Sequence, residues 1–398
     1  MLHAYFDNNA NTAVLPEVLE AMLPALRGEC GNASSIHQLG QSAKAALEQA
    51  RSEVAALVQA PASNICFTSG GTESDNLAIR GLLGAWAEAH PQAPPAHLIT
   101  TRIEHHAVLN VFEDLERAGH AVTWLRPDAN GRVSAADVAA ALRPDTALIS
   151  VMMANNETGV LQPVAEIGAL AREAKVAFHV DAIQAVGRVP VDVGAIGCGA
   201  LSLSAHKIHG PSGVGALYLR RGARLQPQIL GGHHERDHRA GTENLPGILG
   251  FGAAARLARQ ELETRAARYT RLRERLEEGV RRAIPDCLIA GADAARVPNT
   301  SDICFRRIEG EALVIALDLQ GFCVSTGAAC SSGALEPSHV LLAMGWPRAQ
   351  ARASLRFSFG ARNTEAEVEA LLEVLPTLVR KQRALALGAS AAMEARSA

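Results

Sequence analysis

Short apolar runs and amphipathic stretches alternate along the first half of the chain. The apolar runs are four to seven residues long and predict buried strands, whereas the stretches between them carry apolar residues at helical spacing. The predicted strands are 64–68, 98–101, 121–125, 147–153, 176–180 and 200–203. The predicted helices are 16–26, 42–58, 72–89, 105–118, 134–142 and 164–174. This alternation predicts an α/β fold with a mostly parallel sheet flanked by helices, and it places functional residues after the carboxyl ends of strands.

The second half of the chain has a different pattern, which predicts a second domain that begins near residue 260. A helical stretch over 245–284 is too long for one domain and is expected to lead into the second. Strand patterns at 300–306, 321–325 and 354–359 then mix with helical patterns at 310–319, 337–344 and 364–385. Residues 1–15 are expected to form an extended arm, and 231–242 a polar loop. The sequence leaves open whether the Ala-rich tail after Leu387 is ordered.

Composition narrows the class of function. The 398 residues are 48% hydrophobic and 20% charged, which is typical of a soluble globular protein. The net charge of −3 gives no argument for binding nucleic acid or a membrane surface, and no signal peptide or membrane-spanning run is visible. The seven cysteines are scattered and form no CxxC pair. That distribution argues against a disulfide framework or a zinc site, so we expect no metal and a reducing, cytoplasmic compartment.

Lys207 is the first candidate for chemistry. Only four of the 38 basic residues are lysines, namely Lys44, Lys175, Lys207 and Lys381. An arginine supplies charge equally well, but a lysine amine can lose its proton and attack a carbonyl. Lys207 alone follows an apolar strand and precedes a His-Gly-Pro turn, where an α/β enzyme places its chemistry. The alternatives are a Schiff-base lysine and a lysine that happens to lie in a loop.

A glycine turn lies between a predicted strand and a helix at Ser69-Gly70-Gly71-Thr72. Glycines before a helix allow backbone N–H groups to converge on an anion such as phosphate. The simpler alternative is a capped helix, because Thr72 and Asp75 have the spacing of a capping box.

Asp181 and His105 follow two other predicted strands. A carboxylate at position 181 could cap a helix, or it could hold a proton on a pyridine nitrogen. His105 could stack on a ring, although a lone histidine is more often a satisfied polar group. A phosphate nest, an amine and a carboxylate together are what pyridoxal 5′-phosphate (PLP) requires.

Cys330 differs from the other six cysteines, which lie in or near apolar segments. Its surroundings, Ser325-Thr-Gly-Ala-Ala-Cys-Ser-Ser-Gly-Ala-Leu, contain small residues that cannot fix a loop by packing. A thiol in such a loop is a candidate nucleophile, and an unreactive loop cysteine is the alternative.

From YFDNNANT to RFSFG the chain resembles the NifS-type cysteine desulfurases, which are fold-type I PLP enzymes of the class-V aminotransferase family. Seven segments in the family's order carry the resemblance: FTSGGTESDNLAI, IEHHAVL, ANNETG, HVDAIQAVG, LSAHKIHGPSGVGALYLRR, GGHHERDHRAGTEN and STGAACSSGALEPSHVLLAMG. ANNETG and RAGTEN are closer to the nitrogen-fixation branch than to the housekeeping branch. Two segments depart from the usual pattern, GNASS where a proline is usual and NNANT where NNATT is usual, and they leave local loop geometry in doubt.

The resemblance implies a large PLP-binding domain over 14–258 and a smaller α+β domain formed by 1–13 and 259–398, with the cysteine loop at about 323–336. It also implies a role for each matching residue. Lys207 would bind PLP covalently and act as acid and base, His105 would stack on the ring, Asp181 would pair with its nitrogen and Gln184 would contact its hydroxyl. Gly71, Thr72, Ser204 and His206 would hold the phosphate, with Thr242 of the neighbouring subunit of a homodimer. Asn156 and Arg356, with Asn32, would bind the substrate carboxylate, and Cys330 would take the sulfur.

The implied reaction converts L-cysteine to L-alanine and leaves sulfur on Cys330 as a persulfide. An iron–sulfur scaffold or another carrier would receive it, with nitrogenase maturation as the expected use. Two alternatives remain: a selenocysteine lyase or other PLP-dependent lyase or aminotransferase, and a non-catalytic scaffold or sulfur relay with the same fold.

Overall fold

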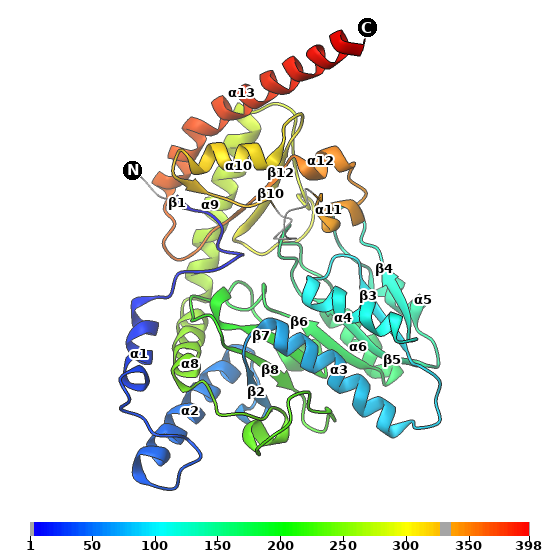
Figure 1. Cartoon of the computed structure of the whole chain (residues 1–398), viewed down its shortest axis with the longest axis vertical. Helices are drawn as coiled ribbons and strands as arrows, with labels where there is room; N and C mark the ends of the chain where they lie inside the picture. The colour runs from blue at the N-terminus through cyan, green and yellow to red at the C-terminus, as the bar shows by residue number, and fades with distance from the viewer. Residues whose placement is uncertain (1–3, 327–335, 398) are drawn as a thin grey trace.

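A seven-stranded sheet organises the lower part of the molecule in this computed structural model, which describes residues 4–326 and 336–397 (Figure 1). In spatial order the strands are β2 (Ile65–Thr68), β8 (Gly215–Leu219), β7 (Ala200–Ser204), β6 (Ala177–Asp181), β5 (Thr146–Met152), β3 (His97–Thr101) and β4 (Ala121–Leu125). Within this sheet β8 alone runs antiparallel to its neighbours. The carboxyl ends of the other six strands therefore lie at one edge, as the sequence predicts for a mostly parallel sheet.

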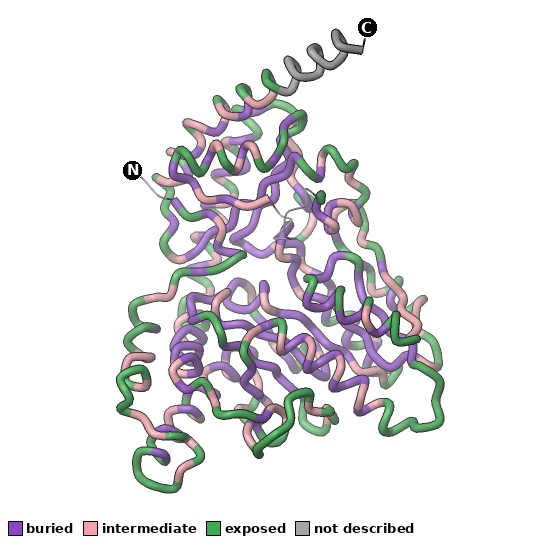
Figure 2. The backbone as a smooth tube through the Cα atoms, viewed as in Figure 1, coloured by how far each residue is buried: buried purple, intermediate pink, exposed green. Residues whose placement is uncertain are grey.

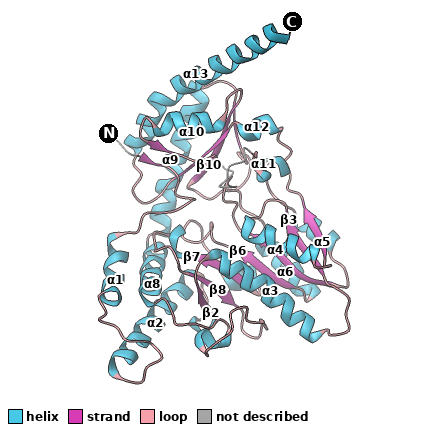
Figure 3. Ribbon diagram, in the orientation of Figure 1, coloured by secondary structure: helices cyan, strands magenta, loops and turns pink. Residues whose placement is uncertain are grey.

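Helices cover both faces of this sheet because neighbouring residues of each strand point to opposite sides (Figure 3). Leu98 packs with α3 (Gly71–Ala89) and α4 (His106–Arg117), whereas Ile99 packs into a core on the other face. The helices of that second face are α2 (Gln38–Leu57), α5 (Ala135–Ala141), α6 (Val164–Ala174), α7 (Val193–Ile196) and α8 (Leu245–Gln260), with α1 (Pro16–Leu26) packed on α8. Figure 2 shows buried backbone in the middle of this part, and outer helices and loops that carry most of the exposed residues.

The upper part of the molecule has its own hydrophobic core around a three-stranded antiparallel sheet. The sheet consists of β12 (Ser354–Ser358), β10 (Thr300–Phe305) and β9 (Cys287–Ile289). It packs against α9 (Leu262–Ala283), α10 (Gly310–Asp318) and α13 (Glu365–Ser397), and α11 (His339–Ala343) and α12 (Arg348–Arg352) lie beside it. The apolar residues of α13 that enter the core recur at helical spacing: Val368, Leu371, Leu375 and Val379.

The N-terminal arm joins the upper core and then descends toward the large sheet. Its strand β1 (Ala4–Tyr5) pairs in parallel with β11 (Phe322–Cys323), and Phe6 is buried in the upper core. The arm therefore reaches the space between the two sheets, as expected for an extended segment. The predicted domain boundaries at 14–258 and 259–398 stay a prediction.

The structure divides one predicted helical stretch in two and excludes one capping alternative. The stretch 245–284 is two helices that break at Glu261 (φ −105°, ψ 10°), because α8 packs on α1 and α2 whereas α9 packs in the upper core. The capping box of Thr72 and Asp75 does not form: Gly70 is the N-cap of α3 and receives no side-chain hydrogen bond. Instead the Glu73 carboxylate accepts from the backbone N–H of Ser69 at 2.8 Å.

Candidate functional site

A cavity of about 290 Å³ opens at the carboxyl edge of the seven-stranded sheet, below the three-stranded sheet. It is the place where α/β folds bind their ligands. Ten of the predicted site residues line it: Gly71, Thr72, His105, Asn156, Asp181, Gln184, Ser204, His206, Lys207 and Arg356. They come from the ends of strands β2, β3, β5, β6 and β7 and from strand β12.

Lys207 lies in a short 3-10 helix, Ala205–Lys207, directly after β7. Its Nζ donates hydrogen bonds to the backbone carbonyls of Asn9 at 2.5 Å and Ala10 at 2.8 Å, both in the N-terminal arm. Burial, followed by the nearby guanidinium groups of Arg188 and Arg356, lowers the pKa of the amine to about 7. A large share of the amine is therefore uncharged near neutral pH, as a nucleophilic lysine needs. The other three lysines are exposed.

The turn before α3 has the shape of an anion site. A Cβ atom added at Gly71 would lie 2.3 Å from Ile183 Cδ1 and 3.6 Å from Ser204 Cβ, so glycine keeps this end of the cavity open. The N–H groups of the first turn of the 19-residue helix α3 are available there. Ser204 Oγ and His206 Nδ1 are hydrogen-bonded to each other at 2.8 Å beside it, and burial lowers the pKa of His206 to about 4. These groups fit a bound phosphate.

Asp181 and His105 line the same cavity as this turn and Lys207. Asp181 ends β6, is buried, and accepts from the backbone N–H of Ile183 at 2.9 Å. The next helix, α7, begins only at Val193, so the helix-capping alternative at the protein surface is wrong. Burial raises the pKa of Asp181 to about 6, while Lys207 acts in the opposite direction. His105 is the N-cap of α4, where its Nδ1 accepts from Ala107 N–H at 3.1 Å. Burial lowers its pKa to about 4, which keeps the ring neutral.

Gln184 also lines the cavity, and hydrogen bonds hold its side-chain amide. Its Nε2 donates to the Asn9 carbonyl at 2.9 Å, and its side-chain oxygen accepts from the buried Arg188 at 2.5 Å. The amide is therefore held in one orientation.

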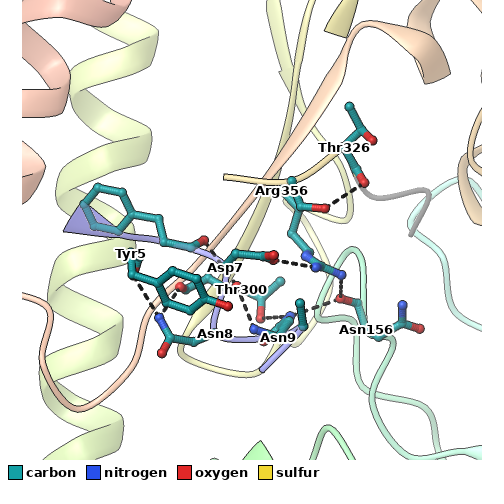
Figure 4. A network of polar contacts seen from close by, with 12 residues as sticks. Tyr5, Asp7, Asn8, Asn9, Asn156, Thr300, Thr326 and Arg356 are labelled. Atoms are coloured by element: carbon teal, nitrogen blue, oxygen red, sulfur yellow. Dashed lines mark hydrogen bonds and ion pairs between the residues drawn. The ribbon is translucent and has the colours of Figure 1, made fainter. Parts of the chain in front are cut away.

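Arg356 belongs to β12 of the upper sheet and lines the cavity. Figure 4 shows its side chain beside Asp7 and Asn156. The Arg356 side chain is only 2% exposed. Nη2 donates to Asp7 Oδ1 at 2.7 Å and Nη1 to the backbone carbonyl of Asn156 at 3.0 Å. Nε has no hydrogen-bond partner within residues 4–326 and 336–397. A guanidinium held in this way presents N–H groups suited to a ligand carboxylate.

Two predicted site residues, Asn32 and Thr242, do not line this cavity on the single chain, and a third cannot be placed. Cys330 lies outside the described residues. Asn32 is exposed, and its Oδ1 accepts from Ser34 N–H at 2.8 Å within its own loop. Thr242 is also exposed on the single chain, at the end of the loop 231–242.

The structure adds cavity residues that the sequence reasoning missed. Asn9 and Ala10 belong to the turn-forming arm, whose polar sequence gave no sign that it reaches the site. Asp75 lines the cavity and is fully buried; its carboxyl oxygens accept no hydrogen bond among the described residues, and Oδ1 lies 3.5 Å from Nε2 of the buried His179. A signal for Asp75 existed: it falls on the buried stripe of α3 with Gly71, Ala78 and Leu82. Burial, followed by the nearby Asp181, raises the pKa of Asp75 well above its usual value.

Comparisons with known proteins agree with this fold and site. The family model "Aminotransferase class-V" matches residues 4–371. "Cysteine desulfurase" of Trichormus azollae is 48% identical over 381 residues, which cover 96% of this chain and 94% of that protein. "Cysteine desulfurase IscS" of Anaeromyxobacter dehalogenans is 50% identical over 382 residues, covering 95% and 93% respectively. A solved "NIFS-LIKE PROTEIN" superposes with a TM-score of 0.88 at 35% identity and covers 95% of this chain and 100% of its own.

The fold and the lysine-centred cavity define an enzyme of the PLP-dependent aminotransferase class. The chain belongs to the class-V aminotransferase family and, within it, to the NifS-type cysteine desulfurases.

No helix in the described ranges has the length and apolar character needed to cross a membrane.

Proposed function

We propose that this chain converts L-cysteine to L-alanine with PLP bound at Lys207 and leaves the sulfur on Cys330. The observation that carries the proposal is a buried lysine, with a pKa of about 7, in one cavity with an anion nest and a buried aspartate. A buried lysine, an anion nest and a buried aspartate each occur separately in many proteins. Their convergence in one small cavity, in a chain 48% identical to a cysteine desulfurase, favours this function.

The lining residues fit PLP in a definite orientation. Gly71, Thr72, Ser204 and His206 would hold the phosphate, and Asp181 and Gln184 would face the ring nitrogen and the ring hydroxyl. His105, neutral and fixed as the N-cap of α4, would lie on the ring face. When bound, PLP supplies an electron sink for the electrons left by proton removal at the substrate α-carbon.

Arg356 and Asn156 would orient the substrate, and Lys207 would move its proton. Arg356, with Asn156, would bind the carboxylate of L-cysteine and so place the α-carbon next to Lys207. The Lys207 amine would take the α-proton and later return a proton to the product, a role that its lowered pKa suits near neutral pH.

The sulfur would pass to Cys330 in a balanced exchange. The Cys330 thiolate attacks the substrate sulfur, the substrate C–S bond breaks, and the products are L-alanine and a Cys330 persulfide. No external oxidant or reductant is needed, because the carbon that loses sulfur gains hydrogen. An iron–sulfur scaffold would then receive the sulfur.

The biological setting is the finer part of the proposal. Relatives named "Cysteine desulfurase" and "Cysteine desulfurase IscS" match at 48% and 50% identity, so overall likeness does not separate the branches. The segments ANNETG and RAGTEN support a role in nitrogenase maturation, and the scattered cysteines support a cytoplasmic compartment. The family resemblance implies a homodimer. Loss of growth on dinitrogen, with normal growth on ammonium, in a strain lacking the gene would support this role. Equal growth defects on both nitrogen sources would contradict it.

Chemical trapping tests the central site directly. The cofactor-free protein is loaded with PLP, reduced with borohydride and digested, and the modified peptide is mapped by mass. We expect a visible absorbance band before reduction and the cofactor attached to Lys207 afterwards. A protein that binds no PLP, or carries it on another lysine, would overturn the proposed function.

A further inference from the structure

Asp7 contacts the cavity residue Arg356 but has no role in the proposed function. It follows β1 and Phe6 in the N-terminal arm, and its carboxylate forms an ion pair with Arg356 at 2.7 Å (Figure 4). The exposed fraction is 20% for the Asp7 side chain and 2% for Arg356, so this pair is screened less than a surface pair. A substrate carboxylate on Arg356 would therefore have a second negative charge nearby.

The arm holds Asp7 in this place through several contacts. The backbone of Asp7 bridges to Ser358, and Asn8 donates through Nδ2 to the Ser358 carbonyl at 2.9 Å. The side chain of Asn9 donates to Thr300 Oγ1 at 2.9 Å and to the Asn156 carbonyl at 3.0 Å. Asp7 is thus a fixed charge and does not belong to a loose terminus.

Other charges that face Arg356 and the cavity do not replace Asp7. Asp302 lies opposite Arg356 in the β10–β12 register. Burial raises its pKa to about 8, so the carboxyl group is protonated and neutral in most molecules at pH 7. Asp181, Lys207 and Arg188 belong to the cofactor side of the cavity or its wall. His105 and His206 are neutral there, because burial lowers the pKa of each to about 4.

We propose that Asp7 is an affinity-determining and positioning residue: as the resident counter-ion of Arg356, it weakens binding of the substrate and product carboxylates so that L-alanine can leave. This inference rests on the proposed function of Arg356. The guanidinium meets an incoming carboxylate with part of its charge already compensated, and the two carboxylates repel each other. At the separations possible around one guanidinium, such a charge changes an affinity by about tenfold.

The same charge acts on Lys207. Asp7 raises the pKa of the amine, against the lowering by burial, Arg188 and Arg356, and Asp181 acts in the same direction as Asp7. Removal of the Asp7 charge should therefore move the pKa of Lys207 downward. A residue that only holds the arm in place would not produce this pH effect together with tighter carboxylate binding.

The test compares two ligands on the PLP-loaded enzyme. L-alanine carries the carboxylate, and ethylamine is the same molecule without it, so the ratio of their dissociation constants isolates the carboxylate contact from any change at Lys207. The variants are Asp7→Asn, which keeps the shape and an acceptor oxygen, and the matched control Asp302→Asn, at a fully buried carboxyl outside the cavity lining. Binding is followed by the change in visible absorbance.

We expect Asp7→Asn to bind L-alanine about tenfold more tightly relative to ethylamine, and Asp302→Asn to stay within about twofold of wild type. The KM for L-cysteine should fall without a rise in kcat, and the pH profile of ligand binding should shift to lower pH. Unchanged or weaker relative alanine binding in Asp7→Asn would overturn the inference, as would an equal effect in Asp302→Asn. If the wild-type enzyme responds to neither L-alanine nor L-cysteine, the proposed function itself fails, which is a distinguishable result.

Discussion

At the scale of single residues, the chemistry depends on what burial does to a few titratable groups. The same removal from water lowers the pKa of Lys207 to about 7, lowers that of His105 to about 4 and raises that of Asp181 to about 6. The result is an amine able to act as a nucleophile and base, a neutral ring and a carboxyl group able to share a proton. Such a set of perturbed groups in one cavity is typical of an active site.

Lys207→Arg should abolish alanine formation as completely as Lys207→Ala. Arginine keeps the charge but cannot bond to the cofactor or exchange the α-proton, so we expect a loss of at least about 100-fold, the low end for a positioned acid–base group. The exposed Lys381→Arg is the matched control and should behave as wild type. Appreciable alanine from Lys207→Arg would refute the assignment.

The pH dependence of cofactor capture gives a second residue-scale prediction. Only the unprotonated amine attacks, so the capture of PLP by the cofactor-free protein should accelerate as pH rises and level off above about 7. An unperturbed lysine would still be gaining rate near its usual pKa of about 10.4. Stopped-flow absorbance measures this profile, and a rate that climbs steadily through pH 9 would contradict the lowered pKa.

At the scale of elements, two ion pairs fasten the loop after β8, one to α2 and the other to the first turn of α3. Arg51 of α2 binds Glu235 through two hydrogen bonds, of 2.6 and 2.8 Å, and Glu235 also accepts from the backbone N–H of Phe67 in β2. Arg239 pairs with Glu73, in the first turn of α3, at 2.9 Å. These contacts hold three successive non-glycine residues with positive φ, at 235–237. The loop that ends in Thr242 therefore has a defined shape.

Arg51→Met should destabilise this loop and the fold around it. Removal of one partner leaves the buried Glu235 carboxylate uncompensated, which costs about 3–5 kcal/mol. The denaturant midpoint should fall, and the double variant Arg51→Met/Glu235→Gln should recover much of the loss. The exposed pair of Arg132 and Glu166 provides the control, since Arg132→Ala should leave the midpoint close to wild type. An equal effect of Arg51→Met and Arg132→Ala would contradict the anchoring role.

The elements also show what the sequence could and could not predict. The strand–helix alternation was predictable because strands such as β3 and β5 are buried runs and the helices α4 and α6 that follow them are amphipathic. Strand β9 could not be predicted from the sequence, because its three residues are all half-buried and show no alternation of buried and exposed positions. Asp75 was assigned to a capping box because it follows Thr72 at the spacing of that motif. Its place on the buried stripe of α3 becomes meaningful only when the residues packed against that stripe are known. Asp7 contacts Arg356 and Asn9 contacts Lys207, although the partners are 349 and 198 positions apart in the chain. No local sequence pattern predicts contacts at such separations.

At the scale of the whole molecule, the site is assembled between two sheets with separate cores. The large sheet supplies Lys207, Asp181 and the turn at Gly71, whereas β12 and the N-terminal arm supply Arg356 and Asp7. A change in how the two parts pack would therefore alter the distance between the proposed cofactor and carboxylate sites.

The proposed homodimer makes a complementation prediction. If Thr242 serves the phosphate site of the partner, mixed dimers of Lys207→Ala and Thr242→Ala chains contain one site with both native residues. Co-expressed and doubly tagged mixed dimers should then regain about half of the wild-type activity per dimer, well above either parent. Activity no higher than that of the Thr242→Ala parent would show that Thr242 acts within its own chain, or in neither site.

The most direct test of the whole account follows the sulfur atom. Protein loaded with PLP receives one equivalent of L-cysteine, and the products and the peptide containing Cys330 are analysed by mass. We predict one L-alanine per site and one added sulfur atom on Cys330, and neither product from Cys330→Ala, although the cofactor band of that variant should still respond to L-cysteine. Alanine and sulfide from Cys330→Ala at the wild-type rate would contradict the mechanism. Pyruvate and free sulfide would indicate a lyase, and turnover of selenocysteine alone would indicate a selenocysteine lyase.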